Sequence, residues 1–356
     1  MVSVKCRSLS TVCQAFPGAV TTRRSIGAVD VRVEAVVGNC DRQTHATHTV
    51  IVLGSPVPAR ALQAITQSLA SLQVAIHSIR QTAHYPLSCF KLLVDDTHSK
   101  VADDALRAAL TDATATEAVD VVITPTHRAR TAKRLVMFDV DSTLVQGETI
   151  DMLATRAGVE AEVREITAAT MRGEIDFAES LEQRVAMLAG LDESAVNEVA
   201  SRIQLTPGAR TTIHTLRRFG YHCGVVTGGF AQVIERLVGD LRLDYVLANN
   251  LQIVDGRLTG RVTGNIIDRP AKAAALREFA AAAGVPMPQT VAVGDGANDL
   301  DMLNVAGLGI AFNAKPLLRE VADASLSFPY LDAVLLVLGF SSEQVAAANR
   351  IEAQRH

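Results

Sequence analysis

The sequence predicts a two-domain α/β protein, in which a parallel sheet with a helical insertion follows a smaller ferredoxin-like α+β domain. Three observations lead to this fold class. The chain has 356 residues, which is more than one ordinary hydrophobic core organises. From Leu135 onward, apolar strand-like runs alternate with longer helical stretches, as in a parallel sheet covered on both faces. Residues 48–125 instead follow the order β-α-β-β-α-β.

Composition and charge exclude several functional classes. The net charge of −4 gives no general attraction to nucleic acid or to an anionic membrane. No apolar run approaches the roughly 18 residues of a membrane span. The five cysteines form no CxxC pair and no zinc-ribbon spacing, so we interpret them as buried, reduced side chains. We therefore expect a cytoplasmic protein that binds neither nucleic acid nor membrane.

The first 45 residues are hard to assign to a domain. Residues 1–29 carry four basic residues, several Ser and Thr and no acid, which is compatible with a transit peptide or with a poorly ordered extension. We favour the extension, because the segment lacks the apolar core of a secretory signal. Residues 29–38 alternate well enough to form one strand.

The ferredoxin-like domain is expected over residues 46–126. The pattern predicts strands at 48–53, 74–83, 87–96 and 118–124 and helices at 59–73 and 101–112. This order resembles the ACT domain, a small regulatory module that often binds amino acids between paired copies. The resemblance implies an amino-acid effector, but a packing or dimerising domain without a ligand fits the same pattern.

The second domain is expected over residues 135–345, after a basic, solvated linker at 127–134 and before a C-terminal tail at 346–356. Its predicted strands are 135–138, 222–226, 245–248, 290–293 and 308–312. An almost wholly helical insertion occupies about 151–207. A smaller insertion at about 249–264 reads as a hairpin around Asp255-Gly256, because Asp-Gly is a strong two-residue turn signal.

Polar motifs follow four elements of this second domain. They are Asp139-x-Asp141-x-Thr143, Thr227-Gly228-Gly229, Lys272 and the run from Gly294 to Asp299. Singly, each has an ordinary explanation as a cap, a turn or a solvated lysine. Because ligands collect at the carboxyl ends of parallel strands, the four together predict a phosphoryl-transfer site.

The chemistry of such a site assigns a role to each side chain. Asp139 and Asp295 would hold Mg²⁺ through oxygen ligands. Asp139 would attack phosphorus, and Asp141 would serve as general acid and then general base.

The remaining motif residues would hold the phosphoryl group and its surroundings. The Thr227 hydroxyl, the Gly228 amide and Lys272 would bind phosphoryl oxygens. Asn298, also a candidate for substrate binding, and Asp299 would orient the metal shell and the lysine.

The motifs DVDST, TGG, the later lysine and GDGAND resemble those of the haloacid dehalogenase-like (HAD) phosphatases, over roughly residues 132–345. The resemblance implies a HAD-like Rossmannoid sheet with a helical cap and a Mg²⁺-dependent phosphoric monoester hydrolase. It also implies an aspartyl-phosphate on Asp139 and the main-chain carbonyl of Asp141 as a further Mg²⁺ ligand.

The cap insertion carries the signals for the substrate. Glu148 lies just beyond the first motif, and Phe177 and Arg184 share a helix face seven residues apart, with Met171 nearby. An acid for an ammonium group, an arginine for a carboxylate and a metal site for a phosphate together describe O-phosphoserine.

Here the resemblance narrows to the phosphoserine phosphatases, in which the positions matching these four residues contact the substrate or close over it. It implies hydrolysis of O-phospho-L-serine to L-serine and phosphate, the last step of serine biosynthesis.

Other readings of the cap residues remain open at this point. Arg184 could form a surface ion pair with Glu182 or near Asp192, Phe177 could be cap core, and Glu148 could favour the start of a helix.

The sequence departs from the family at two places. Thr227 stands where many members have Ser. Only one ACT-like copy is convincing, whereas longer members often have two. Pairing of this domain between two chains would substitute for the missing copy, so we expect a homodimer.

Two other functions stay possible. One is a HAD phosphatase for another small phosphate ester, and the other is an amino-acid-sensing regulator whose HAD domain is idle.

Overall fold

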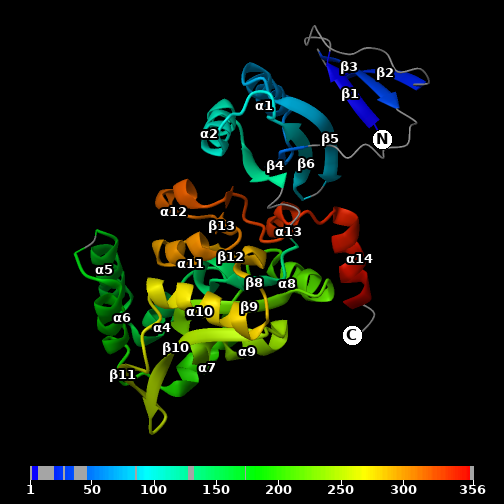
Figure 1. The fold of residues 1–356 in the computed structure, drawn as a ribbon. Helices are drawn as coiled ribbons and strands as arrows, with labels where there is room; N and C mark the ends of the chain where they lie inside the picture. Colours follow the sequence, from blue (N-terminus) through cyan, green and yellow to red (C-terminus); the bar gives the residue numbers. More distant parts are fainter. Residues whose placement is uncertain are drawn as a thin grey trace. The chain divides into compact units, whose positions relative to one another are not determined.

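The computed structural model describes residues 2–6, 20–26, 29–35, 46–84, 86–126, 132–172 and 174–352 (Figure 1). The chain divides into two compact units, residues 1–127 and 128–356. Across the described ranges, no helix has the length and apolar character needed to cross a membrane.

The ferredoxin-like domain has the predicted order of elements. These are β4 (His48–Gly54), α1 (Ala59–Ser71), β5 (Ala75–Ala83), β6 (Ser88–Asp95), α2 (Asp103–Ala113) and β7 (Val119–Pro125). The four strands form one antiparallel sheet in the order β5-β6-β4-β7. The inward faces of both helices, including Ile65, Leu69, Leu106 and Leu110, pack on this sheet. The predicted fold class of this domain is confirmed.

Three further strands lie near the start of the chain. They are β1 (Val2–Cys6), β2 (Val20–Ile26) and β3 (Val29–Ala35), joined in the antiparallel order β1-β3-β2. The strand predicted at 29–38 corresponds to β3, whereas β1 and β2 were not predicted. The rest of the predicted extension, at 7–19, 27–28 and 36–45, lies outside the described residues, as do linker residues 127–131.

The second unit is built on a seven-stranded sheet in the order β11-β10-β9-β8-β12-β13-β14. Its strands are β8 (Leu135–Phe138), β9 (His222–Phe230), β10 (Tyr245–Val254), β11 (Arg257–Thr263), β12 (Thr290–Gly294), β13 (Gly309–Phe312) and β14 (Ala324–Leu326). All neighbours pair in parallel except β11, which is antiparallel to β10. Every residue of the central strands β8, β12 and β13 is buried, as expected for strands covered on both faces.

The predicted hairpin is part of this main sheet. Strand β10 begins as the parallel partner of β9 and ends as the antiparallel partner of β11. The turn residues Asp255 and Gly256 both have positive φ, 50° and 75°, which is the backbone that a two-residue hairpin turn requires. The short strand β14 was not predicted, because three residues give no periodic signal.

Helices cover the sheet and form the cap (Figure 1). The cap helices are α4 (Thr149–Ala157), α5 (Glu160–Met171), α6 (Phe177–Ala186) and α7 (Glu193–Arg202). The others are α8 (Ala209–Arg218), α9 (Ala231–Leu241), α10 (Arg269–Ala282), α11 (Leu300–Val305), α12 (Pro316–Val321), α13 (Ala333–Val337) and α14 (Ser342–Glu352). The apolar side of the cap, with Leu153, Leu181 and Val196, packs against Leu251 and Leu258 of the β10–β11 hairpin.

The predicted C-terminal tail begins inside a helix. Residues 346–352 belong to α14, where Ala348 is buried and its carbonyl accepts a hydrogen bond from His214 Nε2 of α8 (3.3 Å). The Ala-rich composition of this stretch favours a helix. Residues 353–356 lie outside the described residues.

Candidate active site

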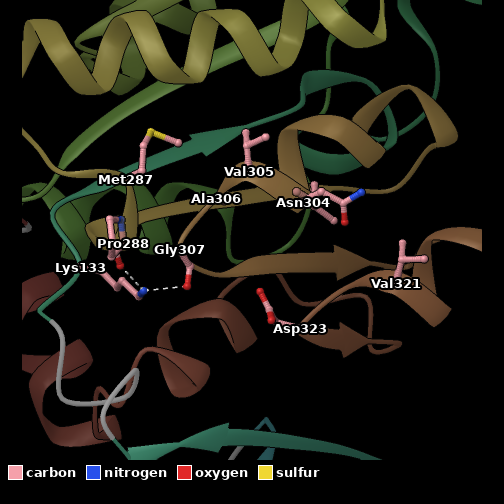
Figure 2. Close-up of a pocket in the computed structure, with 10 residues that line it drawn as sticks. Lys133, Met287, Pro288, Asn304, Val305, Ala306, Gly307, Val321 and Asp323 are labelled. Atoms are coloured by element: carbon pink, nitrogen blue, oxygen red, sulfur yellow. Dashed lines mark hydrogen bonds between the residues drawn. The ribbon is translucent and has the colours of Figure 1, made fainter. Parts of the chain in front are cut away.

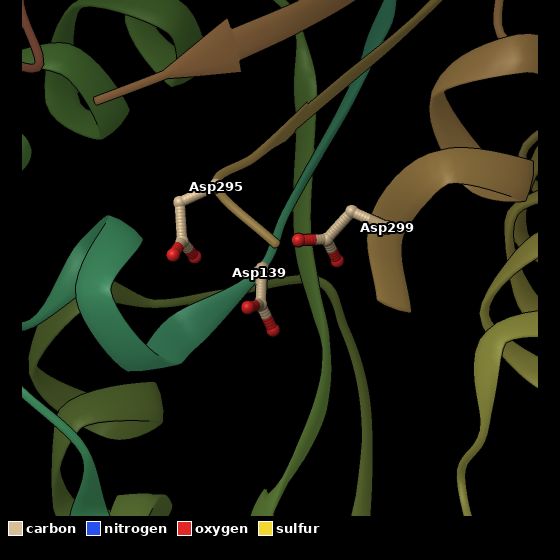
Figure 3. A group of neighbouring side chains, drawn as sticks. All are labelled: Asp139, Asp295 and Asp299. Carbon is tan, nitrogen blue, oxygen red and sulfur yellow. The ribbon is translucent and has the colours of Figure 1, made fainter. Parts of the chain in front are cut away.

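Three aspartates meet at the carboxyl ends of two neighbouring strands (Figure 3). Asp139 follows β8, and Asp295 and Asp299 follow β12. One carboxylate oxygen of each lies within 4.8 Å of the others. Asp139 and Asp299 are buried, and Asp295 is half-buried. Because hard divalent cations prefer carboxylate oxygens, this donor set fits a metal ion.

Lys272 of α10 reaches into this cluster. Its Nζ donates to Asp139 Oδ1 and to Asp299 Oδ1, each at 2.7 Å, and its side chain is fully buried. Burial by itself would lower the pKa of Lys272, but the two carboxylates outweigh it and raise that pKa. Burial, together with the charge of Asp299, holds the pKa of Asp139 well above its usual range despite the lysine.

Asp299 has both of its oxygens engaged within the protein. Oδ1 accepts from Lys272, and Oδ2 accepts from the Gly296 amide at 3.1 Å. A Cβ at Gly294 would lie only 2.4 Å from the Asp299 Cγ, so a glycine there makes room for this acid. The half-exposed Asn298 lies beside the same turn, because a Cβ at Gly296 would lie 2.2 Å from its Oδ1.

Asp141 is held by the start of α4. Its Oδ1 accepts from the Thr149 amide (2.9 Å) and its Oδ2 from the Thr149 hydroxyl (3.2 Å). A Cβ at Gly229 would lie 2.7 Å from Asp141 Oδ2. Burial and then the charge of Glu148 raise the pKa of Asp141 to about 7, so this carboxyl is poised to hold and release a proton near neutral pH.

Thr227 and Gly228 lie near the end of β9. The Thr227 Oγ1 is buried and accepts from the Gly229 amide at 2.9 Å, which leaves its own hydrogen to donate. The Gly228 carbonyl accepts from Asn249 Nδ2 at 2.8 Å. These contacts leave the Thr227 hydroxyl hydrogen available to an anionic ligand.

Sequence reasoning missed Thr149 and Asn249, and it named Thr143 and Gly229 within motifs without assigning either a role. Thr149, Gly229 and Asn249 make the contacts just described, and the Thr143 hydroxyl donates to Asp295 Oδ1 at 3.3 Å. Only Thr149 left a usable signal: it opens a helix, and the first amides of a helix have no partner within it.

Two cap residues approach the same end of the sheet. Phe177 lies over the second motif, because a Cβ at Gly228 would be 3.0 Å from its Cζ. It also packs on the cap core, which agrees with the alternative reading of Phe177 as cap core. Glu148 is exposed, and its Oε1 accepts from the Ser142 hydroxyl at 2.8 Å.

Glu148 is also the residue that precedes the first turn of α4, although its side chain caps no amide there. Its position at a helix start therefore agrees with the alternative reading, and its contact with Ser142 brings it to the nucleophile loop.

Arg184 is half-buried on α6. Its Nε donates to the Ser180 carbonyl (3.2 Å), and no described carboxylate lies within 4.0 Å of it, so the predicted alternative of a surface ion pair is absent here. Desolvation lowers the pKa of Arg184, while the charges of Glu148, Asp151 and Asp141 oppose this shift. The guanidinium therefore lies within electrostatic reach of the acids of the site. The Met171 side chain lies outside the described residues.

A pocket of about 340 Å³ lies at the opposite edge of the sheet (Figure 2). Its residues precede strands: Lys133 comes before β8, Pro288 before β12 and Gly307 before β13. Lys133 Nζ donates to the Pro288 and Gly307 carbonyls at 2.6 and 2.9 Å. This lysine therefore ties two strand starts together, and the predicted chemistry lies at the other end of the strands.

Comparison with known proteins agrees with this geometry. The haloacid dehalogenase-like hydrolase family model matches residues 136–304, and an ACT domain model matches residues 46–124. A phosphoserine phosphatase of Mycobacterium tuberculosis is 57% identical over 304 residues, covering 85% of this chain and 74% of that protein.

Two further relatives point the same way. A phosphoserine phosphatase of Streptomyces coelicolor is 53% identical over 302 residues, covering 85% of this chain and 73% of that protein. A solved structure described as a phospho-aspartyl intermediate analogue of phosphoserine phosphatase aligns with a TM-score of 0.55 and 45% identity, over 58% of this chain and 99% of its own.

Proposed function

This chain belongs to the phosphoserine phosphatases of the haloacid dehalogenase-like hydrolases, and we propose that it hydrolyses O-phospho-L-serine to L-serine and phosphate with Asp139 as nucleophile. The observation that carries the proposal is the buried contact of Lys272 with Asp139 and Asp299 at 2.7 Å each. It holds one oxygen of Asp139 and leaves the other to attack phosphorus.

Two carboxyl groups divide the chemistry. A carboxylate oxygen of Asp139 forms the bond to phosphorus while the bond from phosphorus to the serine oxygen breaks, and that oxygen takes its proton from Asp141. Asp141 then removes a proton from the water that attacks the aspartyl-phosphate. Its raised pKa of about 7 and its fixed contacts with Thr149 support this shuttle.

The phosphoryl oxygens would be held by the Thr227 hydroxyl, the Gly228 amide and Lys272. The Thr227 hydroxyl has a free hydrogen because its oxygen accepts from Gly229. A loose phosphoryl-transfer transition state asks the protein mainly for position and charge balance.

Asp139, Asp295 and the Asp141 carbonyl would hold the metal, for which we propose Mg²⁺. The fit lies in the chemistry of the donors, which are oxygens at a buried strand edge with one lysine to balance three carboxylates. When bound, Mg²⁺ supplies positive charge that offsets the repulsion between these acids and a phosphate. Asp299, with both oxygens engaged, would position Lys272.

The serine portion would lie between the nucleophile loop and the cap. Glu148 would receive the ammonium group and Arg184 the carboxylate, with Phe177, Met171 and Asn298 closing around the substrate. Support comes from the unpaired terminal nitrogens of Arg184 among the described residues and from the position of Phe177 over Gly228. An arginine fork suits a carboxylate better than a lysine would.

The test is phosphate release from O-phosphoserine with Mg²⁺, after EDTA treatment and after Mg²⁺ is restored. Asp139→Asn should abolish release. The control is Asp301→Asn, which makes the same change at an acid of α11 that is ion-paired to Arg269 and should preserve release. Release that survives EDTA, or that survives Asp139→Asn, contradicts the proposal.

A panel of phosphate esters tests the substrate. Arg184→Ala should lower kcat/KM for O-phosphoserine more than for phosphoethanolamine, which lacks the carboxylate. An unchanged ratio between the two would favour a HAD phosphatase for another small ester.

For the ACT domain we propose an amino-acid effector bound near the Gly54–Pro58 loop and pairing of the domain between two chains. The four-stranded sheet with both helices on it supports the module. Calorimetry of the full chain with serine, beside its sedimentation with and without serine, tests both parts. No heat of binding together with a monomer throughout would refute them.

A further inference from the structure

The second motif interrupts the pairing of β9 with β10 for three residues. Strand β9 pairs with β10 as far as Val226 opposite Leu247, and the pairing resumes at Phe230 opposite Asn249. Three residues, 227–229, therefore stand opposite the single residue Ala248. Because the motif bulges out of the ladder, the carbonyl of the half-buried Gly228 loses its strand partner, and a carbonyl shielded from water needs another one.

Asn249 replaces that partner. Its side chain is 1% exposed, its Nδ2 donates to the Gly228 carbonyl at 2.8 Å, and its Oδ1 accepts from the Ile267 amide at 2.9 Å. A carbonyl on one side and an amide on the other permit only one orientation of the side chain. Asn249 is therefore a buried side chain whose hydrogen bonds bridge two segments that are far apart in sequence.

The two segments carry the groups that would hold the phosphoryl oxygens. On one side, the Gly228–Gly229 peptide is fixed at both ends, by Asn249 at its carbonyl and by Thr227 Oγ1 at its amide (2.9 Å). On the other side, Ile267 leads directly into α10, which carries Lys272 in its first turn.

We propose that Asn249 is a positioning residue for phosphate binding, which sets the distance between the Thr227–Gly228 segment and Lys272. The inference rests on the proposed function. Asn249 acts through its neighbours and touches no reacting atom. A displacement of about 1 Å at a reacting group costs roughly 100-fold in rate. The two hydrogen bonds of Asn249 therefore affect catalysis through the position of the phosphate-holding groups.

A half-buried amide side chain that bonds to the same strand offers a matched control. Gln232 of α9 donates from Nε2 to the Leu251 carbonyl (3.0 Å) and accepts at Oε1 from the Leu251 amide (3.1 Å). Like Asn249, Gln232 donates to one main-chain carbonyl and accepts from one main-chain amide. Its partner, Leu251, lies two residues after Asn249 on β10. This partner lies outside both phosphate-holding segments.

The experiment compares Asn249→Leu and Gln232→Met in the full chain, at one fixed Mg²⁺ concentration. For Asn249→Leu we expect kcat/KM for O-phosphoserine to fall roughly 10- to 100-fold. The inhibition constant of inorganic phosphate should rise in parallel, while that of L-serine stays unchanged. Gln232→Met should lower the melting temperature comparably and leave all three kinetic constants near wild type.

Asn249→Asp separates the two hydrogen bonds. Its carboxylate still accepts from Ile267 but presents an oxygen, not a donor, to the Gly228 carbonyl at neutral pH. The same loss of phosphate affinity is expected, and this variant decides the matter if Asn249→Leu does not fold.

Wild-type phosphate affinity in the Asn249 variants, equal losses for phosphate and serine, or equal kinetic losses in Gln232→Met would each overturn the inference. If the wild-type protein releases no phosphate from O-phosphoserine, the proposed function fails instead. Calorimetry with inorganic phosphate on the wild type and the Asn249 variants then decides the role of Asn249, because it needs no turnover.

Discussion

Replacing Gly229 by alanine tests whether the position of Asp141 limits the reaction. Gly229 has no positive φ, so its backbone accepts an alanine without strain. The obstacle is the space for a methyl group. The new Cβ would lie 2.7 Å from Asp141 Oδ2 and 3.0 Å from Thr149 Oγ1, whereas ordinary contact begins at 3.4 Å.

The structure gives the size of the disturbance. The shortfall of about 0.7 Å between 2.7 and 3.4 Å must come from movement of the Asp141 carboxyl or of its turn. Such a movement strains the 3.2 Å hydrogen bond from the Thr149 hydroxyl. We expect a loss of kcat/KM of roughly 100-fold on O-phosphoserine, with a free energy of unfolding lowered by only about 1–3 kcal/mol.

The assay uses two leaving groups. In the proposed mechanism serine would depart as an alkoxide that needs the proton of Asp141, whereas p-nitrophenolate departs as a stable anion. Gly229→Ala should therefore lose far more on O-phosphoserine than on p-nitrophenyl phosphate. The control is Gly239→Ala, in a helix with nothing within 4 Å, which should stabilise the fold by about 0.5–1 kcal/mol without a kinetic effect. Equal losses on both substrates, or wild-type turnover, would refute the reasoning.

Three further predictions follow from buried contacts. Lys272→Met leaves two buried carboxylates without their cation, so it should abolish turnover and lower the free energy of unfolding by roughly 3–5 kcal/mol in urea; an unchanged urea midpoint would contradict this. Thr149→Val removes a hydrogen bond to Asp141 and should reduce kcat about tenfold. Thr149→Ser should retain activity, and a parallel loss in both variants would exclude the hydroxyl as the cause. Burial raises the pKa of the Cys89 and Cys223 thiols, so iodoacetamide at pH 8 should label them only in urea, as peptide mass spectrometry would show; rapid labelling of the folded chain would disprove their burial.

The sequence predicted the parts of the site that depend on local pattern. A buried apolar run followed by an acid marks a strand end, and the strand ends of a parallel sheet meet at one edge. That reasoning was enough to place Asp139, Asp295 and Lys272 in one predicted site. In the structure, Lys272 contacts Asp139, and carboxylate oxygens of Asp139 and Asp295 lie within 4.8 Å of each other.

The roles that the sequence did not indicate depend on contacts between distant segments. Gly229 is needed because Asp141, 88 positions earlier, occupies the space its side chain would take. Asn249 matters because a bulge in β9 leaves one carbonyl without a partner. Neither fact leaves a periodic trace. The same holds for β1, β2 and β14, which lie at sheet edges, and for the part of α14 that falls within the predicted tail.

The buried charges of the site destabilise the fold, and this destabilisation is consistent with a role in ligand binding. Burial and neighbouring acids raise the pKa values of Asp139 and Asp295, the latter to about 7. A purely structural cluster would gain stability by exchanging one acid for a neutral residue. The chain keeps three carboxylates around one buried lysine. This excess of negative charge becomes favourable only when a cation joins it, and the approach of a phosphate to Asp139 has the same requirement. The arrangement therefore favours ligand binding over the stability of the empty fold.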